Sequence, residues 1–207
     1  TMKNITNKRQ FFWSEDSFDK DFTTAKLQLS DKPIRREKVM DFNEPWESEN
    51  ITYLNFFYDE AINKYRMYYC AISRRDENVV NFQEANYPLM NYCYAESEDG
   101  FCWVKPSLGI HKYKDSYDNN IIMDPSVGNA QDNFFVYKDT NPDCPSDERY
   151  KMIGYDERGE ATKRKNGVMS NRVIVYWKSA DGIHFEDMGA LPIEGFFDTH
   201  NTVYWDE

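Results

Sequence analysis

A repeated turn phrase constrains the fold of this chain more than any other feature. Residues 97–108 read SEDGFCWVKPSL and residues 179–190 read SADGIHFEDMGA, so the pattern Ser-x-Asp-Gly, apolar residue, spacer, aromatic residue occurs twice. Asp-Gly between strand-like runs favours a tight hairpin turn, because Gly accepts a positive φ and Asp hydrogen-bonds its own backbone. We therefore interpret Asp99 and Asp181 as turn formers in two equivalent hairpins.

The repeat extends well upstream of the phrase. Residues 55–71 read NFFYDEAINKYRMYYCA, and the second unit has NFFVYKD at 133–139 and DERYKMIGYD at 147–156. Each unit reads as an aromatic strand, an acidic turn, a Lys/Arg-Tyr-x-Met strand, a third strand, the Asp-Gly turn and a fourth strand. Asp59 and Asp139 are the matching acids of the first turn. Four antiparallel strands in tandem repeats are typical of β-propeller blades, and helical patterning is weak, so we predict an all-β chain.

The repeat sets the expected organisation. The final HNTVYWDE (200–207) resembles TYLNFFYDE (52–60) without a following partner strand, so we expect about two and a third blades and a longer natural protein. Exposed strand edges would then favour self-association. The expected parts are an N-terminal segment at 1–41, blade one at about 42–110, blade two at about 118–193 and the start of blade three at 196–207.

Charge and composition exclude several classes of partner. The net charge is −11, whereas phosphate binding needs a basic face, so we expect no nucleic acid. No apolar run approaches 18 residues, so we expect no membrane span. The cysteines form no C-x-x-C pair and have no His at zinc spacing, which predicts thiols in a reducing cytoplasm and no metal or other cofactor. They are Cys70, Cys93, Cys102 and Cys144.

A series of motifs, taken in order, resembles the five-bladed propeller glycoside hydrolases of the furanosidase-like superfamily, near families 43 and 32. The resemblance runs from about Phe42 to the end of the chain. It implies a funnel at one end of the propeller axis and hydrolysis of plant or dietary oligosaccharides by carboxylates, one from the innermost strand of each of the first three blades. The motifs are EPWE (44–47), KYRMYY (64–69), YAESEDGFCWVKPSLGI (94–110), DNNII (118–122), ERYKMIGY (148–155), SADGIHF (179–185) and DTHNTVYWDE (198–207).

Glycoside hydrolysis explains why three carboxylates are expected. One protonates the leaving oxygen, a second attacks the sugar or activates water, and a third holds the substrate and raises the pKa of the acid. By position we assign Asp198 as general acid, Glu47 as nucleophile or base, and Asp132 as the residue that orients sugar hydroxyls. In the family, the position of Asp198 is usually Glu, the motif near Glu47 is usually Asn-Asp-Pro, and the motif around Asp132 is usually Arg-Asp-Pro. This chain departs from the family at all three places. Alternatives from neighbouring positions are Glu44, Glu49 and Asp124.

Three further residues are candidates for substrate binding. His200 and Asn201 belong to a dense polar cluster before the last strand-like run, and Trp46 is either a core residue or a platform for sugar stacking. An isolated fragment of this length is expected to be inactive, because its funnel is only partly walled. The alternative function is a non-catalytic carbohydrate-binding propeller or a truncated remnant. Convergence of Glu47, Asp132 and Asp198 on one cavity would distinguish the enzyme from the binding module.

Overall fold

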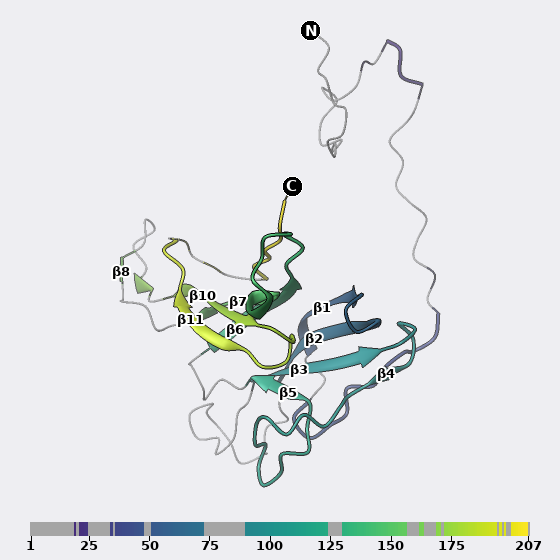
Figure 1. Ribbon diagram of the computed structural model, residues 1–207, viewed down its shortest axis with the longest axis vertical. Helices are drawn as coiled ribbons and strands as arrows, with labels where there is room; N and C mark the ends of the chain where they lie inside the picture. The colour runs from purple at the N-terminus through teal and green to yellow at the C-terminus, as the bar shows by residue number, and fades with distance from the viewer. Residues whose placement is uncertain are drawn as a thin grey trace. The chain divides into compact units, whose positions relative to one another are not determined.

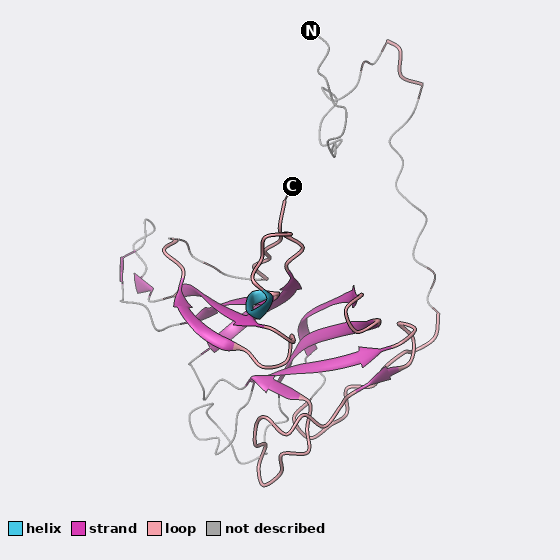
Figure 2. Cartoon of the chain, viewed as in Figure 1, coloured by secondary structure: helices cyan, strands magenta, loops and turns pink. Residues whose placement is uncertain are grey.

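Aromatic and β-branched runs pair with their sequence neighbours to form two antiparallel sheets in the computed structural model of the chain (Figures 1 and 2). The only helix among the described residues is a short 3-10 turn, Ser146–Glu148. The prediction of an all-β chain is confirmed for this part of the protein. The structure describes residues 19, 21–24, 34, 36–47, 51–72, 90–123, 130–156, 162–163, 169–170, 172–193, 195, 197 and 200–206.

Sheet 1 is a meander of four strands in the order β1-β2-β3-β4, and a fifth strand, β5, pairs with β3. The turn between β1 and β2 joins Asp59 to Lys64, which are also partners across the two strands. The strands are β1 (Ile51–Asp59), β2 (Lys64–Ile72), β3 (Met90–Ser97), β4 (Trp103–Val104) and β5 (Ile121–Met123).

Sheet 2 repeats this meander in the order β6-β7-β10-β11, and a separate two-stranded pair, β8 with β9, lies between its second and third strands in the sequence. Neither large sheet closes on itself. Both large sheets are open and antiparallel, and β5, which lies within the stretch expected for blade two, pairs with sheet 1. A closed ring of five such sheets stays a prediction. The strands are β6 (Ala130–Lys138), β7 (Tyr150–Asp156), β8 (Thr162–Lys163), β9 (Met169–Ser170), β10 (Val173–Ser179) and β11 (Glu186–Ala190).

The two Ser-x-Asp-Gly phrases form the same turn. Asp99 Oδ1 accepts hydrogen bonds from the amides two and three residues later, at 2.8 and 2.7 Å, and Asp181 Oδ1 does the same at 2.8 and 2.9 Å. In both turns the serine hydroxyl accepts from the glycine amide at 2.9 Å. The glycines have φ of 77° at Gly100 and 76° at Gly182, which favour Gly over other residues. The interpretation of both acids as turn formers is confirmed.

The first strand of each sheet also carries the same irregularity. The register of β1 shifts between Thr52 and Asn55, and that of β6 between Asp132 and Phe135. At each shift three steps along the first strand face two on its partner, which is a β-bulge. Tyr53 (φ 50°) and Asn133 (φ 69°) occupy the same place in these bulges, with a positive φ that is uncommon for residues other than Gly. The structural repeat thus extends to the backbone conformation of single residues.

The main core lies between the sheets, where β1 and β6 face each other. Asn55 Nδ2 donates to the carbonyl of Val136 at 2.7 Å, and the rings of Tyr92 and Phe134 have centroids 3.8 Å apart. The opposite face of sheet 1 carries a second cluster that contains Trp46 and Tyr69. Because both faces of sheet 1 are covered, its middle strands read as nearly continuous apolar runs. The main core comprises Tyr68, Cys70, Tyr92, Tyr94, Ile122, Met123, Phe134, Val136, Met152, Val175 and Trp177.

Two units divide the chain, Thr1–Glu37 and Lys38–Glu207, and the second unit contains both sheets. All the contacts that position the candidate sites belong to this second unit. Among the described residues no helix is long and apolar enough to cross a bilayer.

Candidate functional site

The first strands of both sheets, β1 and β6, meet at His200. Its Nε2 lies 3.2 Å from the carbonyl oxygen of Phe134 in β6. The imidazole centroid is 5.3 Å from the ring of Tyr53 in β1 and 5.5 Å from the ring of Phe135 in β6. His200 opens the phrase that resembles the start of β1, so this phrase and the first strands of both sheets lie side by side at this residue.

The structure places the predicted acids unequally. Asp132 lies on β6 with its backbone paired to Tyr155, directly before the bulge, and its side chain is outside the described residues. Asp198 falls outside the described residues altogether. Asn201 is partly buried and follows His200 in the segment that contacts β6. Two of the alternative acids also fall outside the described residues, namely Glu49 and Asp124.

Glu47 is fully buried and held by three hydrogen bonds. Oε1 accepts from the Tyr69 hydroxyl at 2.6 Å, and Oε2 accepts from Lys105 Nζ at 2.6 Å and from the Glu44 amide at 3.1 Å. Burial, together with the nearby Cys93 and the Glu47 carboxylate, raises the pKa of Tyr69 far above its usual value, so this phenol stays a proton donor. Tyr69 belongs to the cluster on the face of sheet 1 opposite sheet 2, so the Glu47 carboxylate that it contacts lies on the same face. Lys105 balances the charge of this carboxylate.

Trp46 belongs to the core and also lines an open groove. Its Nε1 donates to Asn120 Oδ1 at 2.8 Å, and its ring meets Tyr113 edge to face at 5.9 Å. The groove has a volume of about 320 Å³, close to the lower end of the range for small-molecule sites. It combines two aromatic side chains with a row of polar ones. It is lined by Pro45, Trp46, Tyr113, Lys114, Asp115, Ser116, Asp118 and Asn119.

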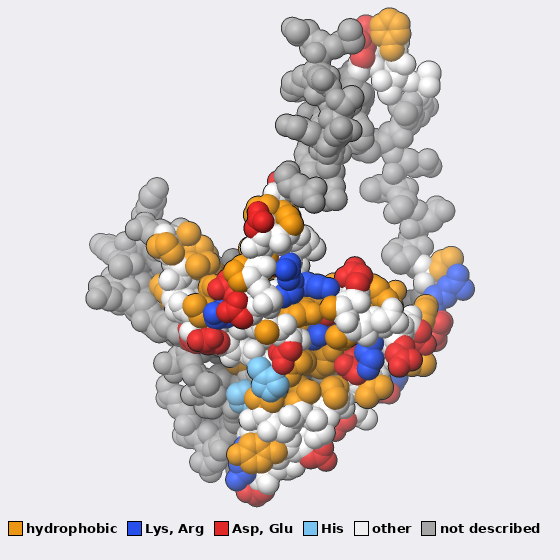
Figure 3. Space-filling view, in the orientation of Figure 1, with side chains coloured by type: hydrophobic (Ala, Val, Ile, Leu, Met, Phe, Trp, Pro, Cys, Tyr) orange, Lys and Arg blue, Asp and Glu red, His pale blue; other side chains and the backbone are white. Residues whose placement is uncertain are grey.

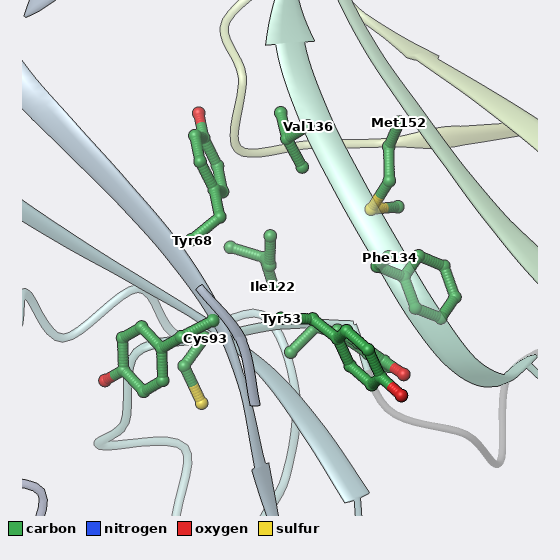
Figure 4. Close-up of a pocket in the computed structure, with 9 residues that line it drawn as sticks. Tyr53, Tyr68, Cys93, Ile122, Phe134, Val136 and Met152 are labelled. Atoms are coloured by element: carbon green, nitrogen blue, oxygen red, sulfur yellow. The ribbon is translucent and has the colours of Figure 1, made fainter. Parts of the chain in front are cut away.

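A second cavity lies inside the main core (Figure 4). Tyr68 and Cys93 approach it from sheet 1, and Phe134, Val136 and Met152 approach it from sheet 2. Its volume is about 10 Å³, which is room for about one water molecule. This cavity is a packing defect between the sheets and is too small for a sugar.

A buried ion network joins the sheets at the end of β1. Asp59 accepts from Arg66 Nε at 2.6 Å, from Lys138 Nζ at 2.6 Å and from the Tyr150 hydroxyl at 2.5 Å. Burial opposes the charge of Asp59, but the bonds from Lys138 and Tyr150 and the field of Arg66 outweigh it and lower the pKa. The sequence analysis read Asp59 only as a turn acid. The available signal was Arg66, a charge within an apolar strand, which is seldom buried without a partner.

The four cysteines are free thiols, as the sequence predicted: three are buried and Cys102 is exposed. Within the part of the chain that the structure describes, no group of three His, Cys, Asp or Glu side chains is arranged to hold a metal ion. On the face drawn in Figure 3, acidic, basic and apolar side chains are mixed. With no such metal group in this part of the chain and no single sign of charge on the drawn face, three places remain as candidates for function. They are the polar groups near His200, the groove beside Trp46 and the surroundings of Glu47.

No protein-family model and no curated protein matches this chain. The resemblance to propeller glycoside hydrolases consequently depends on the motifs and their order, and the assignment of function depends on geometry.

Proposed function

We propose that this chain is the N-terminal part of a five-bladed β-propeller glycoside hydrolase that acts on oligosaccharides or other glycosides. The observation that carries the proposal is the meeting of β1 and β6 at His200, which contacts Phe134 and the ring of Tyr53. Inner strands that begin at one place put the residues preceding them around a common opening. Two equivalent meander sheets with the same bulge and the same hairpin turn support the propeller.

The proposed acids flank this meeting point in the sequence. Asp132 precedes Phe134 by two residues, and Asp198 precedes His200 by two residues. Two residues of extended chain span at most about 7 Å, so we expect both carboxylates near the opening. Asp198 then acts as general acid and Asp132 orients sugar hydroxyls, while Glu47, four residues before β1, is the nucleophile or base; this role requires that its carboxylate be freed from the bonds with Tyr69 and Lys105.

The test is hydrolysis of aryl xylosides and aryl arabinofuranosides by the full-length protein that contains this sequence. Replacing a positioned acid typically costs about 10²- to 10⁴-fold in rate, so Asp198→Asn should lose that much turnover and keep its fold. Asp143→Asn, in an exposed loop, is the matched control and should keep its rate. An unchanged rate for Asp198→Asn, or no hydrolysis of any glycoside by the wild type, would refute the proposal.

A second candidate, non-catalytic carbohydrate binding, is favoured by two specific observations. Glu47 is fully buried and paired with Lys105, which leaves no free carboxylate oxygen to attack a sugar in this conformation. The groove beside Trp46 offers aromatic and polar side chains together, the combination that sugar-binding surfaces use.

Glycan binding separates this candidate from the enzyme. The chain should bind an oligosaccharide without hydrolysing it, and Asp115→Ala at the open side of the groove should weaken binding about tenfold, which corresponds to one lost hydrogen bond to a charged group. Asp198→Asn should leave that affinity unchanged. Equal affinities of Asp115→Ala and the wild type would exclude the groove as the binding site.

A further inference from the structure

A cysteine and a lysine are in contact where the loop between β6 and β7 meets sheet 2. Lys151 Nζ donates to Cys144 Sγ at 3.6 Å. Cys144 lies in the loop at 139–149, and Lys151 is the second residue of β7. Sulfur and amine nitrogen can both form new covalent bonds, and the proposed hydrolysis uses neither of them.

The loop that carries the thiol is held in place by Arg149. Its Nη1 donates to the carbonyl oxygens of Asp139 at 2.9 Å and Asn141 at 3.1 Å, and its Nη2 donates to that of Cys144 at 3.0 Å. The Cys144 amide also donates to the carbonyl of Asn141 at 3.1 Å. Because these bonds fix the backbone around Cys144, its side chain stays next to Lys151.

Asp139 binds the same ammonium group that contacts the sulfur. Its Oδ2 accepts from Lys151 Nζ; burial opposes the charge of Lys151, but this bond outweighs burial and raises the pKa to about 12. Burial likewise raises the pKa of the Cys144 thiol, which is 7% exposed. Both groups are therefore protonated at neutral pH, and Cys144 should react slowly and only with a small oxidant.

We propose that Cys144 and Lys151 form a sulfur–nitrogen cross-link when a hydroperoxide oxidises Cys144. The sulfur attacks one peroxide oxygen and the O–O bond breaks, which leaves a sulfenic acid and releases water or an alcohol. The Lys151 nitrogen, after its ammonium has lost a proton to solvent, attacks the sulfur, and the S–O bond breaks as water leaves. The sulfur is oxidised by two electrons and the peroxide is reduced by two, so the hydroperoxide is the only oxidant required.

The cross-link changes the charge beside a contact between the sheets. It removes the positive charge next to Asp139, which is 4% exposed. Asp139 directly follows Lys138, whose Nζ lies 2.6 Å from Asp59 of β1. The reaction uses none of the proposed catalytic acids, so it can be tested independently of glycoside hydrolysis.

Peroxide treatment followed by mass spectrometry tests the proposal in the chain whose exposed thiol, Cys102, is replaced by Ser. In mildly alkaline buffer the treated chain should become lighter by two hydrogen atoms, and dithiothreitol should restore its mass, because thiols reduce the oxidised sulfur. Trypsin should release residues 139–149 linked to residues 150–158, since it does not cleave after a modified Lys151. These linked peptides distinguish the cross-link from a disulfide.

Lys151→Arg in the same background is the matched control. Arg retains a positive charge for Asp139, but its guanidinium stays protonated and does not attack a sulfenic acid. This variant should therefore give no linked peptides, and its Cys144 should gain oxygen instead. Cys144→Ser should also give none. The proposal would be overturned if Cys144 of the Lys151 chain gained oxygen without forming a link or stayed reduced, or if Lys151→Arg gave the linked peptides.

Discussion

Replacement of Asp59 by Asn removes one charge from the network that joins the two sheets. Asp59 has no exposed surface and holds Arg66 and Lys138 through both of its oxygens, with the Tyr150 hydroxyl as a third donor. Asn keeps the volume of the side chain and retains one oxygen, so the change is electrostatic. It leaves the guanidinium of Arg66, which is 4% exposed, without its counter-charge.

The expected loss follows from the burial of that guanidinium. Removing one partner of a buried ion pair destabilises by about 3–5 kcal/mol, because the remaining charge stays desolvated. For a chain of this size about 1 kcal/mol lowers the melting temperature by about 2–4 °C. Asp59→Asn should therefore melt about 6–20 °C below the wild type, measured by thermal unfolding followed by circular dichroism at neutral pH.

Asp139→Asn provides a matched control in the second repeat. Asp139 occupies the same turn position and makes the same bond to the amide two residues later, at 2.9 Å, but its counter-charge Lys151 is 21% exposed and reaches water. Its loss should be smaller, about 1–2 kcal/mol. Equal losses for the two variants would show that the turn, and not the network between the sheets, determines the stability, and the reasoning would be refuted.

Three other perturbations test the same structure. Gly182→Ala should destabilise about 1–3 kcal/mol more than Gly100→Ala in urea titrations, because the two share their φ but a Cβ at Gly182 would lie 2.8 Å from buried side-chain atoms and one at Gly100 only 3.6 Å from a ring. Bonds from the Cys102 and Phe101 amides lower the pKa of Asp99 to about 2, so the stability lost in Asp99→Asn should be constant above about pH 4 and vanish as the pH falls through 2. Glu47→Gln should lower the free energy of unfolding by about 1–3 kcal/mol, because it leaves Lys105 without its counter-charge. Adding Lys105→Met to this variant should restore part of the lost stability, and strictly additive effects of the two substitutions would contradict the ion pair.

Local patterns predicted the parts of the fold that depend on neighbouring residues. The Ser-x-Asp-Gly phrase encodes its own hydrogen bonds, since Asp99 and Asp181 bond amides two and three residues away. Alternating aromatic strands and short turns likewise encode a meander, in which each strand pairs with the next. The turns and the strand order depend only on residues that are close in the sequence, so both could be predicted from the sequence alone.

Contacts between distant residues were beyond this kind of inference. Lys105 lies 58 residues after Glu47 and Lys138 lies 79 residues after Asp59, so no short-range pattern connects these charges. The positive φ of Tyr53 was hidden for another reason, because an aromatic residue in a strand gives no sign of a bulge. Of the three predicted acids, Glu47 is the one whose side chain the structure describes, and its pairing with a lysine could not be read from the EPWE motif.

The paired bulges place strain in the backbone at equivalent positions of the two sheets. A positive φ outside glycine costs on the order of 1–3 kcal/mol, yet it occurs at the same place in β1 and β6, at Tyr53 and Asn133. Each bulge offsets the residues before it from the ladder that follows, and the strand stays paired on both sides of the irregularity. Asp132 is the last paired residue before the bulge in β6. The strained backbone conformation thus recurs at the same position of the first strand in both sheets, which shows that the repeat is kept at a site where the local sequences, Tyr53 and Asn133, differ.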